Sequence, residues 1–135
     1  MITGAAGGFG ALLASQCLAR GACVIALDLD EAALAEAIGS SERCLLRRAD
    51  VTQISDLKEA VSAGVAAFGG IDVLVNNAGI TRDNLFMRMS DEEWQTVINV
   101  NLTATMKLCK GALRGMMKSR WGRIINISSI VGATG

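Results

Sequence analysis

A chain of 135 residues that is 51% hydrophobic is long enough for one domain with a buried core and too short for two ordinary domains. Thirteen basic and thirteen acidic residues cancel, which argues against the basic surface typical of proteins that bind nucleic acid or anionic membranes. No apolar run approaches the roughly 20 residues of a membrane-spanning helix, and no secretory signal is recognisable. We therefore expect a cytoplasmic protein that binds a small molecule, with no nucleic-acid or membrane partner.

Short β-branched runs alternate with longer amphipathic stretches, which is typical of a parallel sheet wrapped by helices. The expected strands are a stub at Met1–Thr3, then Cys23–Leu27, Arg43–Arg48, Ile71–Val75 and Arg123–Ile127. The expected helices are Phe9–Ala19, a short one capped by Asp30, Ile54–Phe68, one that begins near Asp91, and Asn99–Lys118. We therefore predict an α/β fold class and one domain over residues 1–135.

Local signals support these boundaries. Gly21 and the pair Gly69-Gly70 are suited to end helices, and Ser90 followed by Glu93 predicts a capping box. The strand Cys23–Leu27 has no polar residue, so we expect burial on both faces, as in other parallel strands.

The cysteines form no C-x-x-C pair, and the chain has no histidine to complete a zinc site. We therefore expect no metal site. A free cysteine packs like a small hydrophobic residue, and we expect this of all four: Cys17, Cys23, Cys44 and Cys109.

The segment Thr3–Gly10 reads T-G-A-A-G-G-F-G and lies between the strand stub and the first long helix. A pyrophosphate needs backbone N–H donors and a main chain that approaches closely; glycines permit both, and a helix N-terminus adds a favourable dipole. Glycine spacing alone also fits a plain turn. Asp28, at the end of the second strand, favours a nucleotide because its carboxylate can accept hydrogen bonds from ribose hydroxyls, although a surface turn also accommodates an aspartate.

Five features in this order resemble the short-chain dehydrogenase/reductase family. They are the TGxxxGxG loop at Thr3–Gly10, the adenine-contacting pair Asp50-Val51, the NNAG segment Asn76–Gly79, the helix asparagine Asn101 and the strand-end serine Ser129. Within the family, Gly79–Leu85 and Met87–Met89 look most like the 3-oxoacyl-acyl-carrier-protein reductases, although related reductases of other 3-oxo substrates share this stretch. The resemblance implies a Rossmann-type doubly wound parallel sheet in three α/β/α layers, and NAD(P)(H)-dependent hydride transfer with a 3-oxo or 3-hydroxy acyl substrate.

The resemblance also assigns roles to residues. The expected cofactor-binding residues are Gly4, Gly8, Phe9, Gly10, Asp28, Asp50, Val51, Asn77, Ala78 and Gly79. Ser129 would hydrogen-bond the substrate carbonyl, and only family alignment separates it from Ser128. Asn101 would help organise a water-linked proton relay through its helix backbone, although an ordinary capping residue fits the same position.

The apolar and aromatic residues outside these motifs are less informative. Trp94 and Trp121 are expected to pack rather than contact substrate. Phe86, Met87 and Met89 suit either a substrate mouth or loop packing.

The choice of nucleotide follows from Asp28, whose carboxylate would repel the 2′-phosphate of NADP. We expect no Arg or Lys close enough to offset that repulsion. Relatives that prefer NADP often have a basic residue where this chain has Gly7 and another where it has Leu29. We therefore predict NAD(H) over NADP(H), against the usual preference of the fatty-acid reductases that the chain resembles.

The family's general acid is a tyrosine with a lysine four positions later, and this chain contains no tyrosine. By resemblance it corresponds to about the first half of a typical member, truncated at both ends. Two functions stay open: the nucleotide-binding half of a reductase, or a nucleotide-binding or self-associating fragment that does not catalyse. The expected partners are a dinucleotide, a small-molecule or acyl-carrier substrate, and further copies of the chain in a homo-oligomer.

Overall fold

The computed structural model describes residues 1–83 and 85–130. Asn84, within the motif Gly79–Leu85, and the last five residues of the expected domain lie outside the described residues. The strands are β1 (Ile2–Thr3), β2 (Val24–Asp28), β3 (Cys44–Arg48), β4 (Val73–Asn76) and β5 (Arg123–Asn126). The helices are α1 (Gly8–Ala19), α2 (Glu31–Ile38), α3 (Ile54–Phe68), the 3-10 turn η1 (Phe86–Arg88), α4 (Asp91–Ile98), the π-helical η2 (Asn99–Thr103) and α5 (Ala104–Ser119).

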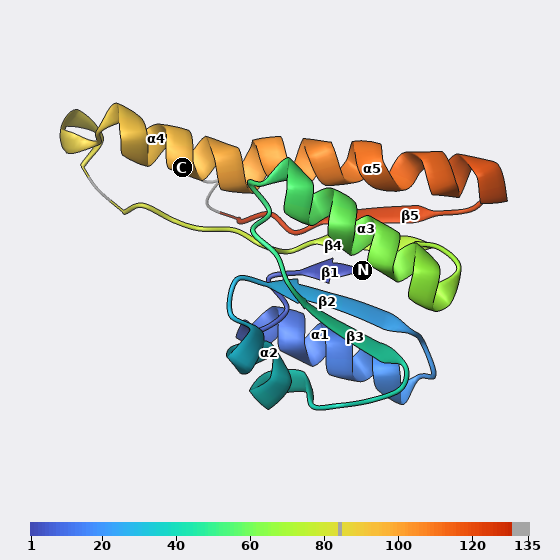
Figure 1. Ribbon diagram of the computed structural model, residues 1–135. Helices are drawn as coiled ribbons and strands as arrows, with labels where there is room; N and C mark the ends of the chain where they lie inside the picture. Colours follow the sequence, from blue (N-terminus) through green and yellow to red (C-terminus); the bar gives the residue numbers. More distant parts are fainter. Residues whose placement is uncertain (84, 131–135) are drawn as a thin grey trace.

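All strand pairs are parallel, in the order β3-β2-β1-β4-β5. Helices α1 and α2 cover one face of the sheet, and α3 with the long rod of α4 and α5 covers the other (Figure 1). The chain therefore winds outward from the central β1 in both directions, which confirms the expected doubly wound, three-layer α/β/α fold.

β1 is short but central. Ile2 pairs with Ala26 of β2 and with Val75 of β4. One residue earlier, the Met1 amine donates to the Val73 carbonyl at 2.8 Å, and the Met1 carbonyl accepts from the Val75 amide at 2.8 Å. The main chain of Met1 therefore extends the contact with β4.

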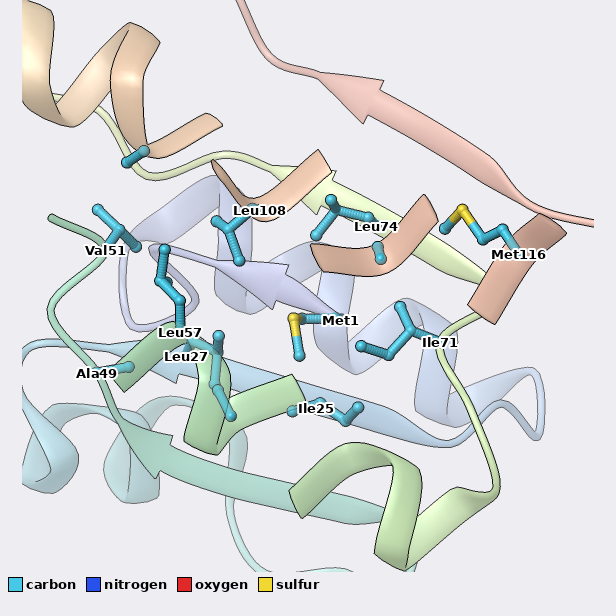
Figure 2. Packing of buried hydrophobic residues seen from close by; sticks show 13 residues of the cluster. Met1, Ile25, Leu27, Ala49, Val51, Leu57, Ile71, Leu74, Leu108 and Met116 are labelled. Atoms are coloured by element: carbon cyan, nitrogen blue, oxygen red, sulfur yellow. The ribbon is translucent and has the colours of Figure 1, made fainter. Parts of the chain in front are cut away.

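Apolar side chains fill both spaces between the layers. Leu27, Leu57, Leu74 and Leu108 meet between the sheet and the α3–α5 layer (Figure 2). Val24, Ala26 and Leu34 belong to the cluster on the opposite face. Because neighbouring residues of a strand point to opposite faces, the buried run Val24–Leu27 feeds both clusters, as predicted for this strand.

The predicted caps are confirmed. Ser90 Oγ accepts from the Glu93 amide at 3.2 Å, and Glu93 Oε2 accepts from the Ser90 amide at 2.9 Å. Asp30 Oδ1 accepts from the Ala33 amide at 3.0 Å and caps α2. Gly69 ends α3 with a φ of +83°, in the left-handed region that favours glycine.

Two expectations were wrong in detail. The helix predicted over Asn99–Lys118 is divided, because Asn99–Thr103 is π-helical and runs on from α4 before α5 begins. Cys23 is exposed rather than buried, because it lies just before the first paired residue of β2, whereas Cys17, Cys44 and Cys109 are half-buried. Within the described residues no helix is long and apolar enough to cross a membrane.

Candidate functional site

A cleft of about 650 Å³ opens at the carboxyl ends of the central strands. Its walls are the segments that follow β1, β2, β3 and β4, and η2 closes one side through Val100. The strand order reverses between β1 and β4, so the segments that follow these strands diverge and leave a crevice, the usual ligand position in open α/β sheets.

All ten residues predicted to bind the cofactor line this one cleft, and their part in binding stays a prediction. They are Gly4, Gly8, Phe9, Gly10, Asp28, Asp50, Val51, Asn77, Ala78 and Gly79. The sequence motifs did not point to several further lining residues, namely Leu29, Asp30, Ala33, Ala49, Ile80 and Val100. Most of these residues are sequence neighbours of a predicted site residue. Extending the prediction to all residues near the end of each strand would therefore have identified them.

The glycine loop combines tight packing with an open face. Gly4 has a φ of +62°, and a Cβ there would lie 2.9 Å from the Ala78 Cα. A Cβ on Gly8 would meet no atom within 4 Å, so this position is open. Gly7 caps α1 without a side-chain acceptor, which leaves the first N–H groups of the helix free for an anion.

The carboxylate of Asp28 connects β2 to the glycine loop. Its Oδ2 accepts from the Ala6 amide at 3.0 Å, and its Oδ1 accepts from the Leu29 amide at 2.8 Å. A carboxylate has about four acceptor positions, so Asp28 retains capacity for hydroxyl donors in the cleft. This residue therefore both shapes the loop and faces the ligand space.

Asp50, in the loop that follows β3, is held by Thr52 and Asp56. Asp50 Oδ1 accepts from the Thr52 amide at 2.8 Å and the Thr52 hydroxyl at 2.7 Å. The Asp50 amide donates to Asp56 Oδ2 at 3.0 Å, and this bond, with that of Ser55, lowers the pKa of Asp56. The short loop after β3 is therefore anchored to the start of α3.

Thr3 joins the two sides of the crevice, a role that the sequence interpretation missed. Its Oγ1 accepts from the Asn77 amide at 3.0 Å and from the Ala78 amide at 2.9 Å. In return, Asn77 Nδ2 donates to the carbonyls of Thr3 and Gly4, both at 3.0 Å. Its position at the end of a buried strand, directly before the glycine loop, is the signal that would have identified Thr3.

A second polar connection lies between β4 and β5. Asn76 Nδ2 donates to Asn126 Oδ1 at 2.8 Å and lies 3.5 Å from Cys109 Sγ. The Ile127 amide donates to the Asn76 carbonyl at 2.9 Å. The segment that carries Asn77–Gly79 and the segment that leads to Ser129 are therefore held in fixed register.

Asn101 and Ser129 lie at the same end of the sheet as the cleft but outside its lining residues. The Asn101 side chain holds the Ile80 main chain from both sides, since Oδ1 accepts from the Ile80 amide and Nδ2 donates to its carbonyl, each at 2.9 Å. The Asn101 carbonyl accepts from the Thr105 hydroxyl at 3.0 Å. Ser129 is exposed in the segment after β5. The catalytic roles of both residues stay predictions.

One basic residue bears on the expectation about charge. The sequence interpretation expected no Arg or Lys close enough to offset the charge of Asp28, and Arg48 on β3 is the register partner of Asp28. Arg48 is outside the cleft lining and instead contributes, with Arg47, Asp56 and Glu59, to an adjoining hollow of about 140 Å³. A parallel register cannot be read from local sequence, which is why this neighbour was missed.

Several aromatic and apolar residues outside the motifs are largely exposed. Trp94 and Trp121 are half-exposed, and the Arg123 guanidinium lies 5.3 Å from the Trp121 ring centroid. The Met87 side chain is 96% exposed, which excludes packing of that side chain within the described chain.

The three layers and the crevice at the switch point define the class of open α/β proteins that bind nucleotides at strand ends. The family model of the short chain dehydrogenases matches residues 1–135, and the chain belongs to this family.

Sequence comparison with known proteins supports this family membership. The chain is 45% identical over 138 residues to the 3-oxoacyl-acyl-carrier-protein reductase FabG of Vibrio harveyi and 44% identical over 138 residues to that of Escherichia coli K12. It is 42% identical over 137 residues to nodulation protein G of Rhizobium sp. N33. These alignments cover 100% of this chain and 56% of each relative, so the chain spans little more than half of their length.

Among solved structures, a short-chain dehydrogenase/reductase of the glucose/ribitol dehydrogenase type from Brucella melitensis superimposes with a TM-score of 0.80 at 38% identity. The superposition covers 84% of this chain and 50% of that one. The likeness therefore extends to most of the fold described above.

Proposed function

We propose that this chain is the nucleotide-binding half of an NAD(P)(H)-dependent oxidoreductase that acts on a 3-oxo or 3-hydroxy acyl thioester-like substrate. The observation that carries the proposal is the single cleft that gathers the glycine loop, Asp28, the Asp50–Val51 pair and the Asn77–Gly79 segment. The names of the reductases of Vibrio harveyi and Escherichia coli support this substrate class.

The residues present fit a dinucleotide. The uncapped N–H groups at the start of α1 would hold the pyrophosphate, where the helix dipole favours an anion by about 0.3–1 kcal/mol. Asp28 would accept from the adenosine ribose, and Asp50 with the Val51 main chain would border the adenine. The segment Asn77–Gly79 would follow the nicotinamide ribose, and Thr3 would keep it at a fixed distance from the glycine loop.

Bound nicotinamide would supply or accept the hydride. In the proposed reaction the Ser129 hydroxyl donates a hydrogen bond to the substrate carbonyl oxygen and stabilises it as negative charge develops. Asn101 keeps the Ile80 main chain beside the cleft, and its backbone carbonyl is the group that we assign to the proton relay.

We propose a preference for NAD(H) over NADP(H). The Asp28 carboxylate is held by the Ala6 and Leu29 amides, so it cannot easily turn away from a 2′-phosphate. Arg48 is the opposing consideration, but it shares its hollow with the carboxylates of Asp56 and Glu59, which offset its charge. The resemblance to the fatty-acid reductases implies a preference for NADP(H). We give more weight to Asp28, because it lines the cleft.

A nucleotide-binding module without catalysis is the second candidate, and the absence of tyrosine from the chain favours it for these 135 residues taken alone. The test is a titration of the chain with NADH, followed by NADH oxidation with acetoacetyl-CoA as the oxo substrate. We expect saturable binding without turnover. The absence of binding would overturn the proposed function, and robust turnover would overturn the dependence on a tyrosine and lysine pair.

We also propose that copies of the chain associate. Leu102 of η2 and Leu113 and Met117 of α5 are exposed, and exposed apolar side chains on one helical layer favour association of that layer with another surface. Sedimentation velocity over a range of concentrations tests this, and a monomer at all concentrations would contradict it.

A further inference from the structure

A second hollow, separate from the nucleotide cleft, lies between α3 and α5, which run side by side over the same face of the sheet (Figure 1). It consists of two stretches of about 720 and 660 Å³. Val61 of α3 and Gly111 of α5 line both stretches, so the two form one continuous surface, which we call the α3–α5 groove.

The floor of the groove is apolar because the two helices present small and aliphatic side chains to each other. Val65 and Phe68 of α3 face Ala112 and Gly115 of α5 along one stretch. A Cβ on Gly115 would meet no atom within 4 Å, so the groove is open at that point. Ile54 and Val65 are about half exposed, which is unfavourable for aliphatic side chains that remain in water.

The rim of the groove is basic. The sequence contains four lysines, and all of them line the groove: Lys58, Lys107, Lys110 and Lys118. Asp72 is the one carboxylate that lines the groove in the described part of the chain. The chain as a whole has no net charge, so this concentration of positive charge is specific to the groove. Lysine stems can cover apolar surface while their ammonium groups reach outward to a partner.

These features select one kind of occupant. A second copy that docked the same groove about a twofold axis would bring two lysine rims together, which is electrostatically unfavourable. The space lies between two helices and away from any strand edge, so it does not suit an added β-strand. An amphipathic helix can place its apolar side on the floor and its acidic flanks against the rim.

We propose that the α3–α5 groove is a docking site for an acidic amphipathic helix of another protein. The α3 helix has 15 residues, which corresponds to about 22 Å, so a partner helix of about 14 to 16 residues would fill the groove. Recognition combines apolar burial with charge pairing, and affinity falls as salt rises.

The probe is a synthetic, dye-labelled 16-residue helical peptide with leucine on one side and glutamate elsewhere. Its binding to the 135-residue chain is followed by fluorescence anisotropy. A peptide of the same design with lysine in place of glutamate is the control. We expect saturable binding of the glutamate peptide alone, and equal binding of both peptides would overturn the proposal.

Two variants locate the site. The double charge reversal Lys107→Glu with Lys118→Glu should weaken binding of the glutamate peptide at least about tenfold. The control Arg20→Glu with Arg82→Glu changes the net charge equally outside the groove and should leave this binding unchanged. Gly115→Leu adds a Cβ that would meet no atom within 4 Å, so we expect it to occupy the groove, to leave Tm undiminished because glycine disfavours helix, and to weaken binding by a similar factor. Unchanged affinity in both groove variants would overturn the proposal.

Other occupants give distinct results. Self-association of the unlabelled chain that Lys107→Glu with Lys118→Glu abolishes would assign the groove to a second copy and overturn the proposal. The chain could instead bind phosphatidylserine vesicles and not the peptide. If the same substitutions abolish that binding, the groove would be assigned to a membrane surface, which would also overturn the proposal.

Discussion

The Asp28 carboxylate accepts a hydrogen bond from the Ala6 amide at 3.0 Å, across 22 positions of sequence. One side chain thus sets the distance between the end of β2 and the phosphate-binding loop. The group that would read the ribose also shapes the turn that would hold the pyrophosphate, and these two functions need separate experiments.

Asp28→Asn removes the negative charge while its one amide oxygen can still accept from the Ala6 amide, at the cost of the acceptor for the Leu29 amide. We expect the ratio of NADPH to NADH affinity to rise at least about tenfold, since the repulsion of the 2′-phosphate disappears. Fluorescence titration with both nucleotides measures this ratio. Arg48→Ala is the control for the neighbouring charge, and an unchanged ratio in Asp28→Asn would show that this carboxylate does not select the nucleotide.

The two glycines of the loop should respond differently to the same added methyl group. Gly4→Ala places a Cβ 2.9 Å from the Ala78 Cα at a φ of +62°, so we expect a loss of unfolding free energy of about 1–3 kcal/mol. Gly8→Ala meets no atom within 4 Å and should leave stability unchanged while the methyl group weakens NADH binding. Urea unfolding and NADH titration of both variants check this, and equal destabilisation would contradict the loop geometry.

Thr3→Val keeps the size of the buried side chain but removes the acceptor of the Asn77 and Ala78 amides. Each amide left unsatisfied costs about 1–3 kcal/mol, so we expect a clear loss of stability in urea unfolding. Thr3→Ser keeps the hydroxyl, so we expect a much smaller loss of stability. If the valine variant is as stable as the wild type, the link across the crevice does not contribute to stability.

In a chain whose first residue is Met1, the Met1 amine makes the free energy of unfolding depend on pH. Desolvation lowers the pKa of this amine from 8.0 to about 6 in the folded state. Between pH 6 and 8 the unfolded chain therefore binds more protons than the folded chain, so stability rises with pH over this window, by about 2 kcal/mol. Urea unfolding at pH 6 and 8 measures the change. N-terminal acetylation should abolish it, and the same slope after acetylation would assign it to other groups.

Much of the fold was predictable because its causes are local. The apolar run at Val24–Leu27, the cap at Asp30 and the capping box at Ser90 each act within a few residues, and the structure has them where they were predicted. The residues of the candidate site could be collected from sequence for a related reason. Each residue predicted to bind the cofactor lies at the carboxyl end of a strand or in the segment that follows it, and parallel strands bring their carboxyl ends to one edge.

What could not be predicted depends on partners that are distant in sequence. The pairing of Asp28 with Arg48 is fixed by strand register, and the hydrogen bonds of Thr3 to Asn77 and Ala78 cross from β1 to β4. The π-helical turn around Asn101 leaves no mark in the apolar periodicity that predicted a continuous helix. The Asn101 contacts with the Ile80 main chain appear only once that turn is in place.

The most direct test of the account is a calorimetric titration of the wild-type chain with NADH and with NADPH under identical conditions. We predict saturable binding of NADH with a Kd at least about tenfold below that of NADPH. Tighter binding of NADPH would contradict the role given to Asp28, and no saturable binding of either nucleotide would contradict the assignment of the cleft itself.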